Sequence, residues 1–142
     1  MKILLAVDGS KHSLKAARYL VRHARSYRNR PRVELVYVQR PLPDLPNMRL
    51  VVGGGQIRQY YEETGSAALS KAKRLLSRAG VRHVARILVG DAAYAIAREA
   101  ARTRSDLIVI GSRGMTAAAN LVLGSVATKV LHVSSVPVML VK

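Results

Sequence analysis

The feature that most constrains the fold is an alternation of short apolar runs with amphipathic helical patterns along the whole chain. The expected strands are Lys2–Val7, Val33–Val38, Val84–Val89, Leu107–Ile110 and Val136–Val141. Runs that are apolar on both faces are typical of a parallel sheet covered by helices. The order βα, βα, βα, βα, β therefore predicts an α/β three-layer sandwich with a parallel sheet.

Four helices are expected between these strands. Ser10 is placed to cap a helix that runs to about Arg28. Gly80 is placed to end a second helix, over Gly65–Ala79. The third and fourth helices are expected at Ala92–Arg102 and Ser125–Val133, the fourth with Val126, Val130 and Leu131 facing inward.

The segment Gln39–Glu63 departs from this pattern. It contains several prolines and the run Gly53-Gly54-Gly55, which makes it too rich in breakers for an ordinary connection. We therefore expect residues 39–63 to form a mobile loop that leads into the second helix. Since no linker or repeat divides the sequence, residues 1–142 are expected to form a single domain.

Composition limits the possible functions. The chain has no cysteine, which excludes disulfides, thiolate metal sites and a cysteine nucleophile. No apolar stretch is long enough to span a membrane, so a cytoplasmic protein is expected. The formal net charge of +16 attracts polyanions without sequence preference, although a merely solvated basic surface explains the same charge.

The segment most informative about chemistry is Gly111–Ser125, which follows the fourth strand. Gly111 and Gly114 allow the backbone to approach a ligand closely or to adopt a positive φ. Gly124 and Ser125 are expected to place free N–H groups at a helix N-terminus, where phosphate is favoured. Glycines that merely form turns would give the same pattern, and the P-loop and GxGxxG motifs are absent.

The expected topology puts a carboxylate beside this loop. Asp8 follows the first strand, and ligands of open α/β sheets lie beyond the carboxyl ends of strands where the strand order reverses. If the first and fourth strands are neighbours, Asp8 faces Gly111 and can accept a hydrogen bond from a ribose hydroxyl or an adenine amine. The alternative role of Asp8 is that of a turn or capping residue.

Other polar residues offer weaker candidates. His12 lies one helical turn from Asp8, but no nucleophile accompanies the pair, and a solvated histidine is the simpler interpretation. Asp91 follows Gly90 and is expected to cap the third helix rather than to bind magnesium. The histidines have no metal-ligand spacing, so neither a catalytic group nor a metal site is assigned.

The spacing Gly111-x2-Gly114-x9-Gly124-Ser125 resembles the ATP-binding motif of the universal stress protein family. The flanking residues and the opening Ile3–Ser10 are similar to the family as well, so the resemblance covers essentially the whole chain. It implies a Rossmann-like fold with strand order 3-2-1-4-5. It also implies an ATP site, with Asp8 and Val38 at the adenosine end. The residues that the resemblance assigns to this site are Ala6, Asp8, Val38, Ile110, Gly111, Arg113, Gly114, Gly124, Ser125 and Val126.

Three classes of function follow. The resemblance favours an ATP-binding regulatory or stress-response module that takes ATP with or without Mg²⁺. An enzyme with weak ATPase activity and a basic nucleic-acid-binding variant are the alternatives, although stacking aromatics are scarce. A homodimer is expected through Val136–Val141, because this apolar strand would lie at an edge of the sheet.

Overall fold

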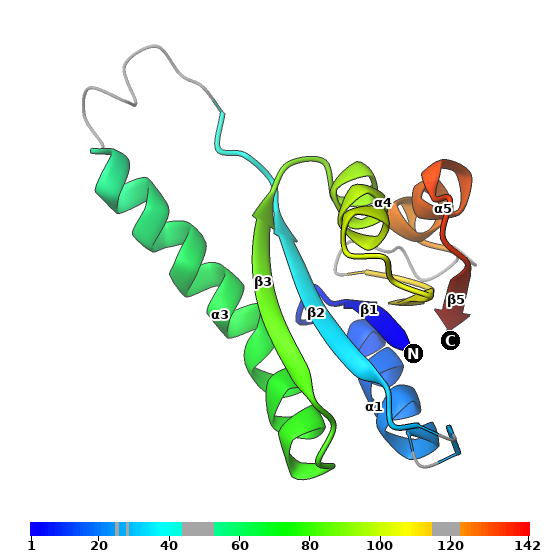
Figure 1. Ribbon diagram of the computed structural model, residues 1–142. Helices are drawn as coiled ribbons and strands as arrows, with labels where there is room; N and C mark the ends of the chain where they lie inside the picture. The colour runs from blue at the N-terminus through cyan, green and yellow to red at the C-terminus, as the bar shows by residue number, and fades with distance from the viewer. Residues whose placement is uncertain (25, 28, 44–52, 115–122) are drawn as a thin grey trace.

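The protein folds around a single five-stranded parallel sheet, seen in a computed structural model that describes residues 1–24, 26–27, 29–43, 53–114 and 123–142 (Figure 1). The strand order β3-β2-β1-β4-β5 confirms the predicted topology. The strands are β1 Lys2–Ala6, β2 Arg32–Gln39, β3 His83–Val89, β4 Leu107–Gly111 and β5 Val138–Val141. The helices are α1 Lys11–His23, α3 Gly54–Arg78, α4 Ala92–Arg102 and α5 Ser125–Val133.

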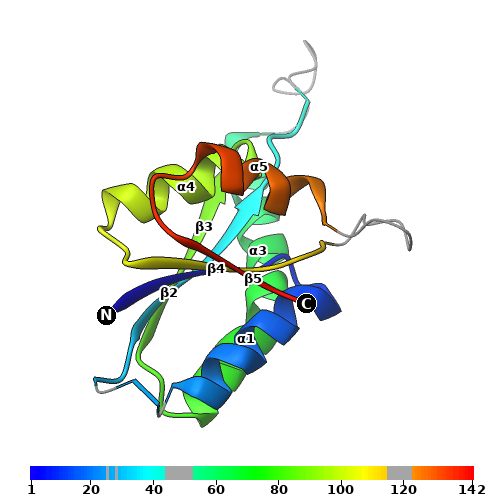
Figure 2. The ribbon, with the colours of Figure 1, turned by 90° about the vertical axis from the view of Figure 1, so that its right-hand side faces the viewer.

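The helices form two outer layers. Figure 2 shows α1 and α3 on one face of the sheet and α4 and α5 on the other. Alternate strand residues point to opposite faces, so Leu5 and Leu35 belong to the core beneath α1 and α3. Leu4 and Val36 belong to the core beneath α4 and α5. The predicted three-layer sandwich is therefore confirmed.

Helix α1 begins as predicted but ends early. The Ser10 side chain accepts a hydrogen bond from the Ser13 N–H at 3.1 Å and so caps the helix. The helix ends at His23 rather than near Arg28. After His23 the Ser26 N–H donates to the His23 carbonyl at 2.9 Å, which closes a turn in place of another helical bond.

Helix α3 begins earlier than the sequence suggested. It starts at Gly54 and not at Gly65, so the expectation of a loop is wrong for residues 54–63. The glycine run lies at the helix start, where its cost is small, and residues 56–63 contain no breaker. Residues 44–52 of the expected loop lie outside the described residues. Gly80 ends the helix with a φ of +65°, as predicted.

The two edge strands differ from their sequence-based description. Strand β3 is apolar in sequence, yet Val84 is 57% exposed and Val89 45% exposed, because no strand covers its outer side within the described residues. Strand β5 begins at Val138 and occupies the opposite edge, as expected. Leu131 of α5 was predicted to face inward but is 44% exposed, since it lies one helical step beyond the buried Val130.

Candidate functional site

Strands β1 and β4 are hydrogen-bonded neighbours, and this pairing brings two predicted loops together. Ala6 is in register with Ile110, so the chain leaves both strands at the same edge of the sheet. The chain first adds β2 and β3 on one side of β1, and it then returns to add β4 and β5 on the other side. The order of the strands therefore reverses between β1 and β4. The loops after β1 and β4 therefore lie at the topological switch point of the sheet, as expected.

Asp8 connects these two loops. One of its carboxylate oxygens accepts a hydrogen bond from the Ser10 N–H at 2.9 Å, which gives Asp8 the turn role considered from the sequence. The other oxygen, Oδ2, lies 2.8 Å from the position that a Cβ would take on Gly114. A side chain at Gly114 would therefore collide with the Asp8 carboxylate. The turn role and a place beside the glycine loop are compatible in this geometry.

The glycines of the loop are used for close approach and not for a positive φ. None of Gly111, Gly114 and Gly124 has a positive φ, so that alternative is wrong. A Cβ on Gly111 would lie 2.8 Å from the carbonyl oxygen of His12, in the first turn of α1. Gly111 therefore allows α1 to pack against β4, and its lack of a side chain has a structural cause.

The start of α5 is fixed to the end of β4. The Gly124 N–H donates to the Ser112 carbonyl at 2.7 Å, so the expectation that this N–H is free is wrong. Gly124 is the N-cap and has no side chain with which to cap the first turn. Ser125, which follows it, is exposed. By contrast, Ser10 caps α1 and Asp91 caps α4. The first N–H groups of α5 therefore have no side-chain cap among the described residues, and they lie at the same edge of the sheet as Asp8.

The apolar residues assigned to the site share one face of the sheet. Ala6 and Ile110 are buried in the core beneath α4 and α5, and Val38 and Val126 pack against that core. These four residues therefore belong to the apolar packing at this edge of the sheet, and of them only Val126 lines the cleft described below. Arg113 is half-buried in the loop after β4. Residues 115–122, which include Thr116 and Asn120, lie outside the described residues.

A cleft of about 480 Å³ lies at this edge, between the ends of β2 and β3 and the start of α5. Of the residues assigned from the sequence, Ser125 and Val126 line it. The others that line it were not assigned and are Arg40, Pro41, Gly90, Asp91, Ala92, Ala93 and Lys129. Helical spacing in the sequence places Lys129 one turn after Ser125. Nothing in the sequence indicates its contact with Asp91.

Asp91 and Lys129 form an ion pair at the rim of this cleft. The Lys129 Nζ donates to Asp91 Oδ2 at 2.9 Å and lies 4.5 Å from the centre of the Tyr94 ring. The hydrogen bond from Lys129 lowers the pKa of Asp91, and the same bond raises the pKa of Lys129. Asp91 also accepts from the N–H groups of Ala93 and Tyr94, as predicted for a cap. The pair holds the start of α4 to α5.

Tyr37 is a further residue that the sequence did not indicate. Burial raises the pKa of Tyr37, and electrostatic interactions with Tyr60 and Asp8 raise it further. Its hydroxyl donates to the Gln39 side chain at 2.7 Å. Tyr37 thus places a hydroxyl group on the α3 side of the sheet, near Asp8.

Neither a metal site nor a membrane-spanning helix is found in the described part of the chain. Its histidine, aspartate and glutamate side chains nowhere gather in a group of three that could hold a metal ion. Among its helices, none combines the length and the apolarity that crossing a membrane requires.

A parallel sheet of order 3-2-1-4-5, with helices on both faces and a glycine loop at its switch point, defines a Rossmann-like α/β protein. The sequence model of the universal stress protein family matches residues 1–142, and the chain belongs to this family.

Individual relatives agree with this assignment. A universal stress protein of Thermus aquaticus is 34% identical over 99% of this chain and 97% of its own length. One from Methanocaldococcus jannaschii is 32% identical over 99% of this chain and 81% of its own length.

Solved structures show the same fold. UspA of Lactobacillus plantarum superposes with a TM-score of 0.83 at 18% identity, over 100% of this chain and 97% of that one. An Arabidopsis thaliana family protein with AMP bound gives a TM-score of 0.71 at 23% identity, over 100% and 91%. The Archaeoglobus fulgidus protein in complex with dAMP gives 0.68 at 23% identity, over 100% and 98%.

Proposed function

We propose that this protein binds ATP, carried with Mg²⁺, at the edge of the sheet where Asp8 meets Gly114, and that it acts as a nucleotide-dependent regulatory module of the stress response. The observation that carries the proposal is the contact distance of 2.8 Å between Asp8 Oδ2 and the Cβ position of Gly114. It puts a hydrogen-bond acceptor and a bare backbone at one point of the switch-point crevice. Family membership and the relatives with bound AMP and dAMP support a nucleotide as the ligand.

Each part of the site has a chemical task in this proposal. Asp8 accepts a hydrogen bond from the ribose or the adenine amine, and Val38 supplies an apolar surface for the adenosine. Ser125 and the first N–H groups of α5 bind phosphate oxygens, because the positive end of the helix dipole lies there. Arg113 adds positive charge. Magnesium enters bound to the phosphates, which is its usual mode in nucleotide sites.

The test is calorimetric titration with ATP and Mg²⁺, compared with inorganic triphosphate. Gly114→Val should abolish ATP binding, because its side chain collides with the Asp8 carboxylate and fills the crevice. Gly55→Val is the matched control, since nothing lies within 4 Å of its Cβ position. Equal affinity for ATP and triphosphate, or normal ATP binding by folded Gly114→Val, would refute the proposed site. Phosphate release in the same samples tests the alternative of weak ATP hydrolysis.

We also propose that the protein is a homodimer joined through residues 136–141. Strand β5 lies at an edge of the sheet, and all four of its residues are partly exposed. The Ile108 N–H donates to the Pro137 carbonyl, and the Ser112 N–H donates to the Val141 carbonyl. These bonds show that the odd-numbered residues of this segment face β4. Residues 138 and 140 therefore turn their backbone groups away from β4. A two-fold partner can pair with these groups.

A further inference from the structure

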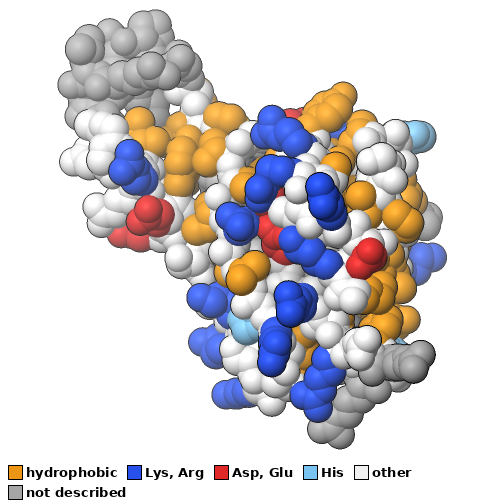
Figure 3. Space-filling model, in the orientation of Figure 1, with side chains coloured by type: hydrophobic (Ala, Val, Ile, Leu, Met, Phe, Trp, Pro, Cys, Tyr) orange, Lys and Arg blue, Asp and Glu red, His pale blue; other side chains and the backbone are white. Residues whose placement is uncertain are grey.

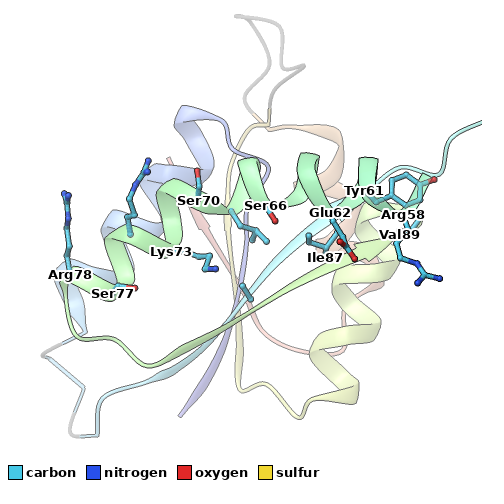
Figure 4. A pocket seen from close by; sticks show the side chains of 13 residues that line it. Arg58, Tyr61, Glu62, Ser66, Ser70, Lys73, Ser77, Arg78, Ile87 and Val89 are labelled. Carbon is cyan, nitrogen blue, oxygen red and sulfur yellow. The ribbon is translucent and has the colours of Figure 1, made fainter. Parts of the chain in front are cut away.

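A cavity larger than the cleft beside Asp91 lies on the opposite face of the sheet, in a groove between α3 and the edge strand β3 (Figure 2). Its volume is about 840 Å³. Figure 4 shows that its labelled side chains follow α3 along its length, with Ile87 and Val89 on the strand opposite. We refer to it as the α3–β3 groove. It is lined by Arg58, Tyr61, Glu62, Ser66, Leu69, Ser70, Lys73, Arg74, Ser77, Arg78, Ala85, Ile87 and Val89.

The backbone of β3 is open along this groove. The Val33 N–H donates to the Arg82 carbonyl, and the Gly90 N–H donates to the Gln39 carbonyl, both at 2.9 Å. These bonds show that even-numbered residues of β3 face β2. Ala85, Ile87 and Val89 therefore turn their N–H and carbonyl groups outward, away from the sheet. Because β3 is the end strand of the described sheet, these groups form a template for one more strand.

The floor of the groove is apolar at the same residues. The side chains of Ala85, Ile87 and Val89 line it together with Leu69 of α3. Ala85 is exposed and Val89 is 45% exposed, so part of this apolar surface faces water. An added strand would place every second side chain over this floor. The groove thus favours an extended peptide with apolar residues at alternate positions.

The rim of the groove is basic. It carries four basic side chains against the single carboxylate of Glu62. No described carboxylate forms an ion pair with Lys73, Arg74 or Arg78, whereas Lys2, Lys129 and Arg86, which lies on β3 but does not line the groove, are paired. Figure 4 shows Lys73 extending from α3 toward β3. The face that carries β3 is also rich in Lys and Arg (Figure 3). An occupant with carboxylates between its apolar residues complements this rim.

We propose that the α3–β3 groove binds an extended acidic peptide segment of a partner protein, which adds to β3 as a sixth strand. Main-chain hydrogen bonds to residues 85, 87 and 89 supply affinity, and the basic rim selects acidic sequences. A nucleic acid fits less well, because Tyr61 is the one aromatic side chain among the lining residues and offers little stacking. A second copy of this chain is disfavoured at this groove, because a two-fold contact there would bring two basic rims together.

The first experiment measures binding of a fluorescent peptide of about eight residues, the length of an ordinary strand, that alternates valine with glutamate. Fluorescence anisotropy is recorded without nucleotide, so the outcome does not depend on ATP binding. Lys73→Glu with Arg74→Glu should weaken binding by about tenfold or more, since two attractions become repulsions. Lys15→Glu with Arg18→Glu makes the same charge change on exposed positions of α1 and should alter the affinity less than about twofold.

The second experiment tests strand addition itself. Only one alternate set of peptide amides can face β3, so N-methylation of that set should abolish binding, while N-methylation of the other set should preserve it. Equal binding of the two methylated peptides would overturn the added strand. A valine–lysine peptide that binds as tightly as the valine–glutamate peptide would overturn the acidic peptide as the occupant. So would oligothymidylate that binds more tightly than the peptide, if Lys73→Glu with Arg74→Glu removes this binding. Ala85→Pro removes an outward N–H from the protein and should also abolish binding.

Discussion

At the scale of single residues, glycines close together in the sequence serve different contacts. Gly111 lies against the backbone of His12, whereas Gly114 lies against the Asp8 side chain. A backbone neighbour cannot rotate away, but a side chain can. Substitution at Gly111 should therefore affect the fold, and substitution at Gly114 should affect the crevice. The motif spacing alone does not separate these two roles.

We predict opposite effects on stability for two glycine-to-alanine changes. Gly111→Ala should lower the free energy of unfolding by about 1–3 kcal/mol, because its Cβ would lie 2.8 Å from the His12 carbonyl oxygen. Gly55→Ala should raise it by up to about 1 kcal/mol, because its Cβ meets nothing within 4 Å at the start of α3. Urea denaturation of both variants checks the pair. An unchanged stability of Gly111→Ala would contradict the close packing of α1 on β4.

At the scale of elements, an ionic cluster joins three strands to α4. Glu34 of β2 is only 1% exposed and pairs with Arg86 of β3 at 2.8 Å and with Lys2 of β1 at 3.2 Å. Glu99 of α4 pairs with Arg102 at 2.6 Å and with Arg86 at 3.5 Å. A buried carboxylate requires such partners, since an unpaired charge there would be costly. The cluster thus fixes how α4 lies on the sheet.

We predict that the contribution of Glu99 to stability depends on pH. The hydrogen bond from Arg102 lowers the pKa of Glu99 in the folded protein, so folding favours the ionised form. Its contribution is present above the unfolded pKa of about 4.3 and is lost as the pH falls through the lowered folded value. Glu99→Gln should therefore cost about 1 kcal/mol at pH 7 and progressively less below about pH 4. Urea denaturation between these pH values measures the difference, and a pH-independent cost would contradict it.

At the scale of the whole molecule, the sheet has two open edges with different surroundings. Strand β3 runs beside the basic rim of the α3–β3 groove, whereas β5 is a short apolar strand at the opposite edge. The net charge of +16 opposes contact between identical protomers, and salt screens that repulsion. We therefore propose different partners for the two edges: an acidic peptide at β3, where the basic rim lies, and a second copy at β5.

We predict a homodimer at tens of micromolar protein in physiological salt, with association that tightens as salt rises from low concentration. Val138→Pro should give monomers, because it removes an outward N–H at the first residue of β5, where proline is tolerated. Ala85→Pro makes the same change at the other edge and should leave the dimer intact. Sedimentation velocity measures both. A monomeric wild type, or a dimer unaffected by Val138→Pro, would contradict the β5 interface.

The sequence alone was sufficient for features that depend on local pattern. The strand order was implied by the family resemblance. The alternation of elements predicted the parallel sheet, and the caps at Ser10, Gly80 and Asp91 followed from single residues beside helix ends. These features are encoded within a few residues, because periodicity and capping are short-range effects. The assignment of Asp8 and Gly114 to one crevice also followed, once β1 and β4 were expected to be neighbours.

Only the tertiary structure decided contacts between residues distant in the sequence. The packing of Gly111 on His12, the pairing of Asp91 with Lys129 and the cluster around Glu34 depend on register and helix placement, which no local pattern encodes. The start of α3 at Gly54 was not predicted, because the glycine run was interpreted as a helix break. Glycines cost little in the first turn of a helix, so the helix can begin there. The α3–β3 groove exists because α3 crosses an edge strand, so its basic rim and open backbone meet only in the folded chain.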